Sequence, residues 1–228
     1  MGMMQLAVQS LCLALMTYAI FCDFQIPLLF QGAVLGKGIY LTHQTLWILV
    51  TYFGLGFIAS VSREILGKRF NALEGFVHWS SPMAGGFGLF LTIMFYALVW
   101  PNAGFHENVI KPLEKQGIPM TYYQHVIHSP SIGLVLLECL AKRPELVYAK
   151  VEPALAYFKY FVIFGAWYVF VLRYNFSVTG GWPYPFMSEF TAEWQHWVFY
   201  TFCFGFIWLL GVVHRSVLLA VTRKPKTK

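Results

Sequence analysis

Long apolar runs separated by short polar segments are the main pattern of this sequence. Six such runs, each about 20 residues long, cover residues 4–22, 40–62, 78–100, 121–141, 154–174 and 194–214. As helices that rise 1.5 Å per residue, runs of about 20 apolar residues cross the roughly 30 Å hydrocarbon core of a bilayer. The pattern therefore predicts an all-α polytopic membrane protein, a bundle of about six transmembrane helices in a single domain over residues 1–228.

The composition agrees with a membrane protein and leaves little sequence for a soluble domain. Hydrophobic residues make up 58% of the chain and charged residues only 11%, whereas soluble domains carry about 25% charged residues. The first run has no basic segment before it and no small-residue cleavage site, so we expect a membrane helix there and not a secretory signal. The plasma membrane and the endoplasmic reticulum are both compatible with this composition.

The basic residues indicate which way the helices face. With six helices, both termini and the loops at 63–77 and 142–153 share one side of the membrane. That side holds twelve Lys and Arg residues: Arg63, Lys68, Arg69, Lys142, Arg143, Lys150, Lys159, Arg215, Arg223, Lys224, Lys226 and Lys228. The opposite side holds the other four: Lys37, Lys111, Lys115 and Arg173. Because positive residues concentrate in cytosolic segments, both termini are predicted to be cytosolic, with 215–228 as a basic cytosolic tail.

The net charge of +6 fits this topology and contact with anionic membrane lipids, and it does not indicate a nucleic-acid partner. Cysteine spacing gives no sign of a metal site. All four cysteines lie in or at the ends of apolar runs: Cys12, Cys22, Cys139 and Cys203. Buried free thiols and no metal are therefore expected.

Two histidines interrupt the apolar segment "YYQHVIHSPSIGLVLLECL" at 122–140. Their spacing places His125 and His128 on one face of a helix. In the predicted topology this helix and the helix over 40–62 both enter from the non-cytosolic side. Thr42 lies in the first turn of the second helix, and His128 lies on the order of 10 Å into the fourth. The threonine and the histidine could therefore meet in the non-cytosolic half of the bilayer.

Each of these polar residues also has a structural interpretation. A threonine in a membrane helix, such as Thr42, commonly bonds its own backbone four residues back. Intramembrane histidines often form hydrogen bonds between helices, and His43 is near enough to a helix end to reach the lipid headgroups. Glu138 is followed four residues later by Lys142, so we expect these two to form an ion pair at the cytosolic interface.

Three short motifs occur in order along the chain. "LT" at 41–42 opens the second predicted helix, "HVIH" at 125–128 is followed ten residues later by Glu138, and "GGWPYPF" at 180–186 separates the last two helices. In these motifs the chain resembles the androgen-induced gene 1 family. The resemblance implies a multipass membrane hydrolase that cleaves fatty acid esters of hydroxy fatty acids with a threonine nucleophile and a histidine, without a cofactor.

The resemblance also assigns site residues, position by position. The nucleophile matches Thr42 and the catalytic histidine matches His128. His125 matches the first histidine of its motif, and with Trp182 and Tyr184 of the "GGWPYPF" segment it is assigned to the substrate pocket or to a supporting role.

A threonine and a histidine can together catalyse the hydrolysis of an ester. A threonine hydroxyl is a weak nucleophile until a base removes its proton, and neutral imidazole, with an ordinary pKa near about 6.5, is a suitable base. The sequence places no carboxylate at the depth of His128, so a backbone carbonyl or a tyrosine is expected to orient the ring. Attack on an ester would form an acyl-threonine, and a lipid with two acyl arms would fit an apolar groove between helices.

A haem protein of the cytochrome b561 type is the alternative, because it also needs intramembrane histidines, paired at matched depth on facing helices. The candidates on the non-cytosolic side are His43, His125, His128 and His196. Those on the cytosolic side are His78 and His214. This interpretation gives "GGWPYPF" no role. A transporter would be expected to show paired membrane carboxylates or broken-helix repeats, and neither is found. The sequence leaves the oligomeric state open.

Overall fold

The computed structural model describes residues 2–29 and 32–222, and its long elements are all helices. Five helices are long and apolar enough to cross a membrane: α1 (Gly2–Gln25), α2 (Leu41–Glu64), α3 (Asn71–Met94, prolonged by a π-helical turn at Phe95–Val99), α9 (Ala154–Thr179) and α10 (Glu193–Val221). No strand occurs in the described part of the chain. The protein is therefore an all-α polytopic membrane protein, as its hydropathy pattern predicted.

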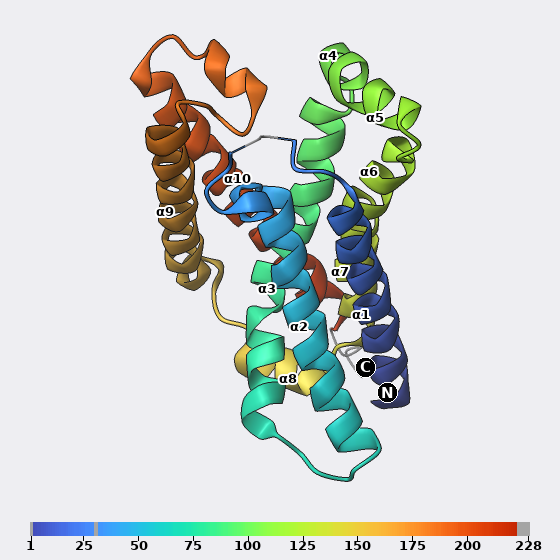
Figure 1. Ribbon diagram of the computed structural model, residues 1–228. Coiled ribbons are helices and arrows are strands. Elements are labelled where there is room, and N and C mark those ends of the chain that lie inside the picture. The colour runs from blue at the N-terminus through green and yellow to red at the C-terminus, as the bar shows by residue number, and fades with distance from the viewer. Residues whose placement is uncertain (1, 30–31, 223–228) are drawn as a thin grey trace.

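The apolar run predicted to form one helix over 121–141 is divided in two. Helix α6 (Met120–His128) and helix α7 (Pro130–Ala141) follow one another, with Ser129 between them. Pro130 causes the break, because proline has no N–H to donate and its ring clashes with the carbonyl four residues back. The two short helices lie end to end beside α1 (Figure 1).

Two other helix boundaries differ from the expected ones. Helix α3 begins at Asn71, seven residues before the expected start at position 78, and its first turn carries Glu74, which is buried in an ion pair with Arg63. Helix α10 continues to Val221, so the predicted tail at 215–228 begins inside a helix. The last part of that tail, residues 223–228, lies outside the described residues.

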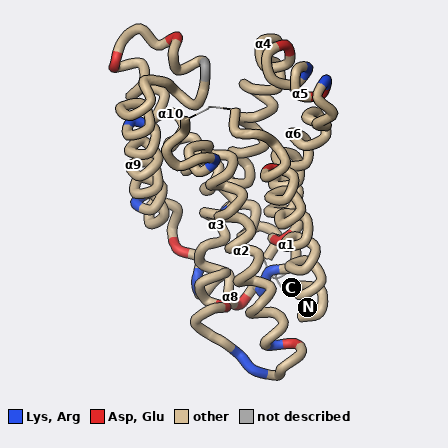
Figure 2. The backbone as a smooth tube through the Cα atoms, viewed as in Figure 1, with Lys and Arg blue, Asp and Glu red and all other residues tan. Residues whose placement is uncertain are grey.

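Short elements join the long helices at the two ends of the bundle. They are the helix α4 (Ala103–Phe105), the π-helical turn His106–Ile110, α5 (Lys111–Lys115), α8 (Pro144–Lys150) and the 3-10 turns Gly36–Ile39 and Pro185–Glu189. Figure 1 shows α4, α5 and the segment between α9 and α10 at one end, and α8 with the loop between α2 and α3 at the other. Charged residues gather mainly near the two ends in Figure 2.

A buried ion pair ties the bundle together. Lys142 Nζ lies 2.7 Å from a carboxylate oxygen of Glu138, and both side chains are almost completely buried. The Tyr52 hydroxyl and the Gln9 amide donate to the same carboxylate, and Lys142 donates to the carbonyl of Val77. The expected pair is formed, and it is buried because side chains and backbone of α1, α2 and α3 enclose it.

The orientation of the bundle is open to a direct test. We expect a cysteine introduced at Lys111 to react with a membrane-impermeant maleimide only from the non-cytosolic side, and one at Lys226 only from the cytosol. The native cysteines are buried, which keeps the background labelling low. Labelling of position 111 from the cytosol would overturn the predicted topology.

Candidate active site

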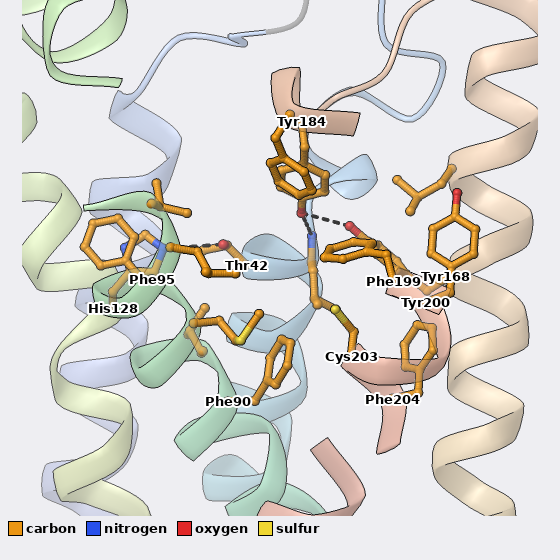
Figure 3. Close-up of a pocket in the computed structure, with 17 residues that line it drawn as sticks. Thr42, Phe90, Phe95, His128, Tyr168, Tyr184, Phe199, Tyr200, Cys203 and Phe204 are labelled. Atoms are coloured by element: carbon orange, nitrogen blue, oxygen red, sulfur yellow. Dashed lines mark hydrogen bonds between the residues drawn. The ribbon is translucent and has the colours of Figure 1, made fainter. Parts of the chain in front are cut away.

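Thr42 and His128 face each other where α2 begins and α6 ends. Thr42 is the second residue of α2, and His128 is the last residue of α6. Although 86 residues separate them in the sequence, Thr42 Oγ1 lies 3.4 Å from His128 Nε2. Figure 3 shows the two side chains meeting at one side of a pocket. This distance is slightly longer than the about 2.6–3.2 Å of a catalytic hydrogen bond, and such contacts often shorten only when substrate binds.

The His128 ring is fixed in one orientation and one tautomer. Its Nδ1 lies 2.8 Å from the backbone carbonyl of Gln124. A carbonyl only accepts hydrogen bonds, so Nδ1 carries the proton of the neutral ring and Nε2 presents its lone pair to Thr42. The ring also stacks on Phe95, with centroids 3.7 Å apart and planes inclined by 6°. The expected orienting group is therefore a backbone carbonyl.

The break between α6 and α7 gives the end of α6 an anchor on α3. No N–H group of the same helix donates to the last carbonyls of a helix, so they need other partners. The Thr92 hydroxyl of α3 donates to the carbonyl of His128, and Ser131 of α7 donates to it at 3.3 Å. Pro130 thus ends α6 at the residue whose side chain faces Thr42.

Tyr184 holds the start of α2 beside Thr42. The backbone N–H of Leu41 donates to the Tyr184 hydroxyl at 2.9 Å. The Tyr168 hydroxyl, 2.8 Å from that of Tyr184, donates to the carbonyl of Ile39 at 3.1 Å. Since the carbonyl only accepts, Tyr168 must accept from Tyr184. This chain of hydrogen bonds connects the "GGWPYPF" segment and α9 to both sides of the turn that precedes Thr42.

An apolar pocket adjoins the two polar side chains. Its volume is about 110 Å³, and its walls come from α2, α3, α6, α9, α10 and the segment before Phe186. Apart from Thr42 and His128, the lining is aliphatic and aromatic, with three tyrosines and Cys203 as its remaining polar groups. The site can therefore exclude water from a reaction at Thr42 while accepting an apolar chain.

Comparison with known proteins agrees with the architecture and the motifs. A family model described as FAR-17a/AIG1-like protein matches residues 4–217. The chain belongs to this family. No curated protein and no solved structure shows a significant match. The matched region includes Thr42, His128 and Tyr184.

His125 and Trp182, which were expected in the substrate pocket or in a supporting role, do not line the pocket. His125 Nδ1 lies 2.5 Å from the Tyr96 hydroxyl, and its ring packs on Trp100 with centroids 4.4 Å apart. His125 therefore joins α6 to the end of α3. Trp182 stacks on Phe176 at 4.3 Å, beyond the pocket wall.

Two residues of the site carried no signal in the sequence. Phe95 stacks on His128, and Tyr168 belongs to the hydrogen-bonded chain at the start of α2. Each is one of many aromatic residues in an apolar run, so spacing does not distinguish it from a residue that packs in the core. Only the contact between distant helices identifies them.

Two of the histidines considered as haem ligands, His43 and His128, have a protein partner at each ring nitrogen. The Nδ1 of His43 lies 2.6 Å from a carboxylate oxygen of Asp23, and its Nε2 accepts from Trp47 at 3.0 Å. His128 likewise has a protein partner at each ring nitrogen. The described residues contain no cluster of three or more His, Cys, Asp or Glu side chains suited to a metal.

Proposed function

We propose that this protein is an intramembrane hydrolase that cleaves fatty acid esters of hydroxy fatty acids, with Thr42 as the nucleophile and His128 as the general base. The observation that carries the proposal is the contact between Thr42 Oγ1 and the lone-pair side of His128 Nε2. Their position at the wall of an apolar pocket supports a lipid substrate. The resemblance to known family members suggests the class of ester.

In the proposed acylation step, His128 Nε2 takes the proton of Thr42 Oγ1 while the oxygen attacks the ester carbonyl. The tetrahedral intermediate collapses when the C–O bond to the leaving group breaks. The protonated His128 returns its proton to that oxygen, and the hydroxy fatty acid leaves as the free alcohol. The other fatty acid stays bound to Thr42 as an acyl ester.

The start of α2 supplies a favourable electrostatic environment for this step. The first N–H groups of a helix lack acceptors within the helix, and they give its N-terminus a partial positive charge. Thr42 lies in that first turn. Negative charge that develops on the carbonyl oxygen near Thr42 would be stabilised there, in the manner of an oxyanion hole.

In the proposed deacylation step, His128 acts on a water molecule in place of Thr42. His128 takes a proton from a water molecule, whose oxygen attacks the acyl carbonyl, and then returns that proton to Thr42 Oγ1. The products are the free fatty acid and the original threonine. Over the two steps, the proton of Thr42 leaves with the hydroxy fatty acid and a proton from water replaces it, so the proposal requires no cofactor.

The substrate would reach the pocket from the surrounding lipid. Leu98, on the π-helical turn that ends α3, lines the pocket and is 52% exposed. In a membrane, an exposed apolar side chain at this position faces acyl chains. An ester dissolved in the bilayer could therefore enter beside Leu98 without crossing water.

A comparison of two threonines of α2 tests the proposal. We expect Thr42→Ala to abolish hydrolysis of a fatty acid ester of a hydroxy fatty acid by purified protein in lipid nanodiscs, because the nucleophile is lost. Thr45→Ala, a matched control on the same helix, should retain activity, since Thr45 is buried and does not line the pocket. Loss of activity only in the Thr45 variant would assign the nucleophile to Thr45, about one helical turn further along α2.

A further inference from the structure

A second polar cluster lies beside the pocket, where α9 and α10 approach the segment that joins them. The guanidinium carbon of Arg173 lies 5.4 Å from the ring centre of Trp182, 5.3 Å from that of Trp197 and 5.7 Å from that of Tyr200. His196 packs on Trp182 with centroids 4.8 Å apart. The cluster is therefore built from a cation, a histidine and a phenol inside an aromatic frame.

Several hydrogen-bonding groups of this cluster have no partner. Both ring nitrogens of His196 and Nε of Arg173 are buried without a hydrogen-bond partner among the described residues. The buried Tyr200 hydroxyl lies within reach of the Arg173 guanidinium, and its own proton has no acceptor among the described residues. His196 is 6% exposed and Tyr200 is 3% exposed. A buried polar group without a partner costs about 1–3 kcal/mol, and native structures contain few of them. Several in one place indicate a ligand.

We propose that Arg173, His196 and Tyr200 form a subsite that binds the carboxylate of the lipid substrate. This inference rests on the proposed function, because it assigns the acidic end of the same ester. The unpartnered groups of Arg173 and Tyr200 donate hydrogen bonds, and His196 can donate from either ring nitrogen, which suits a ligand with oxygen acceptors and negative charge.

The subsite is continuous with the site of cleavage. Tyr200 lines the same pocket as Thr42 and His128. Figure 3 shows Tyr200 on the side of the pocket opposite His128. A lipid could therefore place its ester carbonyl at Thr42 while its carboxylate reaches the cluster.

The position of the cluster fits a charged headgroup. Arg173 lies near the end of α9 and Glu193 at the start of α10, at the end of the bundle that also carries Thr42. Tryptophans are enriched at membrane–water interfaces, and two of them frame this arginine. The carboxylate would remain at the interface while the acyl chains lie in the hydrocarbon.

Among the described residues Glu193 is the acidic group paired with this arginine, and it leaves Nε of the guanidinium free. The Glu193 carboxylate contacts the two terminal nitrogens of Arg173 at 3.0 and 2.6 Å, and Nε has no partner among the described residues. The Glu193 side chain is 62% exposed. Water screens such an exposed charge, which limits its competition with a ligand carboxylate.

Two substrates that differ only at the acid test the subsite. We expect the wild-type protein to hydrolyse the fatty ester with a free carboxylate faster, by kcat/KM, than the same ester with that carboxylate capped as a primary amide. Arg173→Gln should lower the ratio of acid to amide kcat/KM by about 10- to 100-fold, as expected for a lost charge-assisted hydrogen bond. Tyr200→Phe, which removes only a hydroxyl, should lower it several-fold.

Glu193→Gln is the matched control, because it breaks the same ion pair and leaves Arg173 in place. It should keep the wild-type ratio. An equal fall of the ratio in Glu193→Gln, or an unchanged ratio in both Arg173→Gln and Tyr200→Phe, would overturn the subsite while leaving hydrolysis at Thr42 intact. Hydrolysis that survives in Thr42→Ala would instead refute the proposed function.

Binding provides a readout that does not depend on catalysis. We expect cis-parinaric acid, a fluorescent fatty acid, to bind the wild-type protein more tightly than its carboxamide does. Arg173→Gln should remove that preference, and Glu193→Gln should retain it. Equal Kd values for the acid and the amide in the wild-type protein would contradict the subsite, whatever the protein hydrolyses.

Discussion

Replacing His128 with alanine is expected to lower the rate of ester hydrolysis by roughly 10²–10⁴-fold, the range for loss of general acid–base catalysis. His128 Nε2 is the group that contacts the Thr42 hydroxyl, and no other basic side chain lines the pocket in the described part of the chain. Steady-state hydrolysis of a fluorogenic fatty ester by purified protein would measure the effect. A thermal unfolding midpoint close to that of the wild type would show that folding is intact.

His125→Ala is the control for this measurement. It removes an imidazole from the same helix, but His125 contacts Tyr96 and Trp100 instead of the pocket. We expect a much smaller loss of rate. Equal losses in the two variants would contradict the assignment of the base to His128.

The pH dependence of the wild-type rate gives a second check on His128. The neutral imidazole is the form that accepts the proton of Thr42, so protonation at low pH removes the base. The rate should therefore rise with pH as the His128 ring loses its proton, and then level off. His128→Ala should lose this rise, whereas His125→Ala should keep it.

Breaking the buried ion pair is expected to have the largest effect on stability. Glu138→Gln keeps the shape of the side chain and leaves the positive charge of Lys142 without its counter-ion, inside the bundle. Removal of one partner of a buried ion pair costs about 3–5 kcal/mol. We expect a marked fall in the unfolding midpoint in detergent, or loss of folded protein on expression.

A double substitution separates charge from packing in this result. Glu138→Gln combined with Lys142→Met removes both charges, and replacement of a whole buried pair by apolar groups is often neutral or stabilising. We expect it to recover most of the stability lost in Glu138→Gln. A double variant as unstable as the single one would show that the carboxylate acts mainly through Tyr52 and Gln9.

The sequence predicted the five long membrane helices and suggested that Thr42 and His128 could meet. Apolar runs of the right length predict membrane helices because bilayer thickness sets their length. The basic loops and the rise of a helix then suggested that Thr42 and His128 lie at similar depth. Their contact in the structure follows from α2 and α6 starting at the same end of the bundle.

The sequence did not predict how each helix is rotated about its axis or which side chains its neighbours bury. The spacing of Glu138 and Lys142 predicts their pairing, but burial depends on α1 and α3, which pack on α7, and on Tyr52 of α2. In the same way, Trp182 shares a motif with Tyr184, yet it stacks on Phe176 while Tyr184 reaches Leu41. Pro130 divides the helix predicted over 121–141 into α6 and α7. A count of apolar residues does not detect this break, although the proline itself is visible in the sequence.

The central claim is that Thr42 is a nucleophile activated by His128, and the site of covalent capture tests it most directly. The wild-type protein would be treated with a fluorophosphonate probe, digested, and the modified residue located by mass spectrometry. We expect the adduct on Thr42, and we expect labelling to be absent in Thr42→Ala, strongly reduced in His128→Ala and retained in Thr45→Ala. An adduct on another residue, or undiminished labelling of Thr42→Ala, would contradict the account.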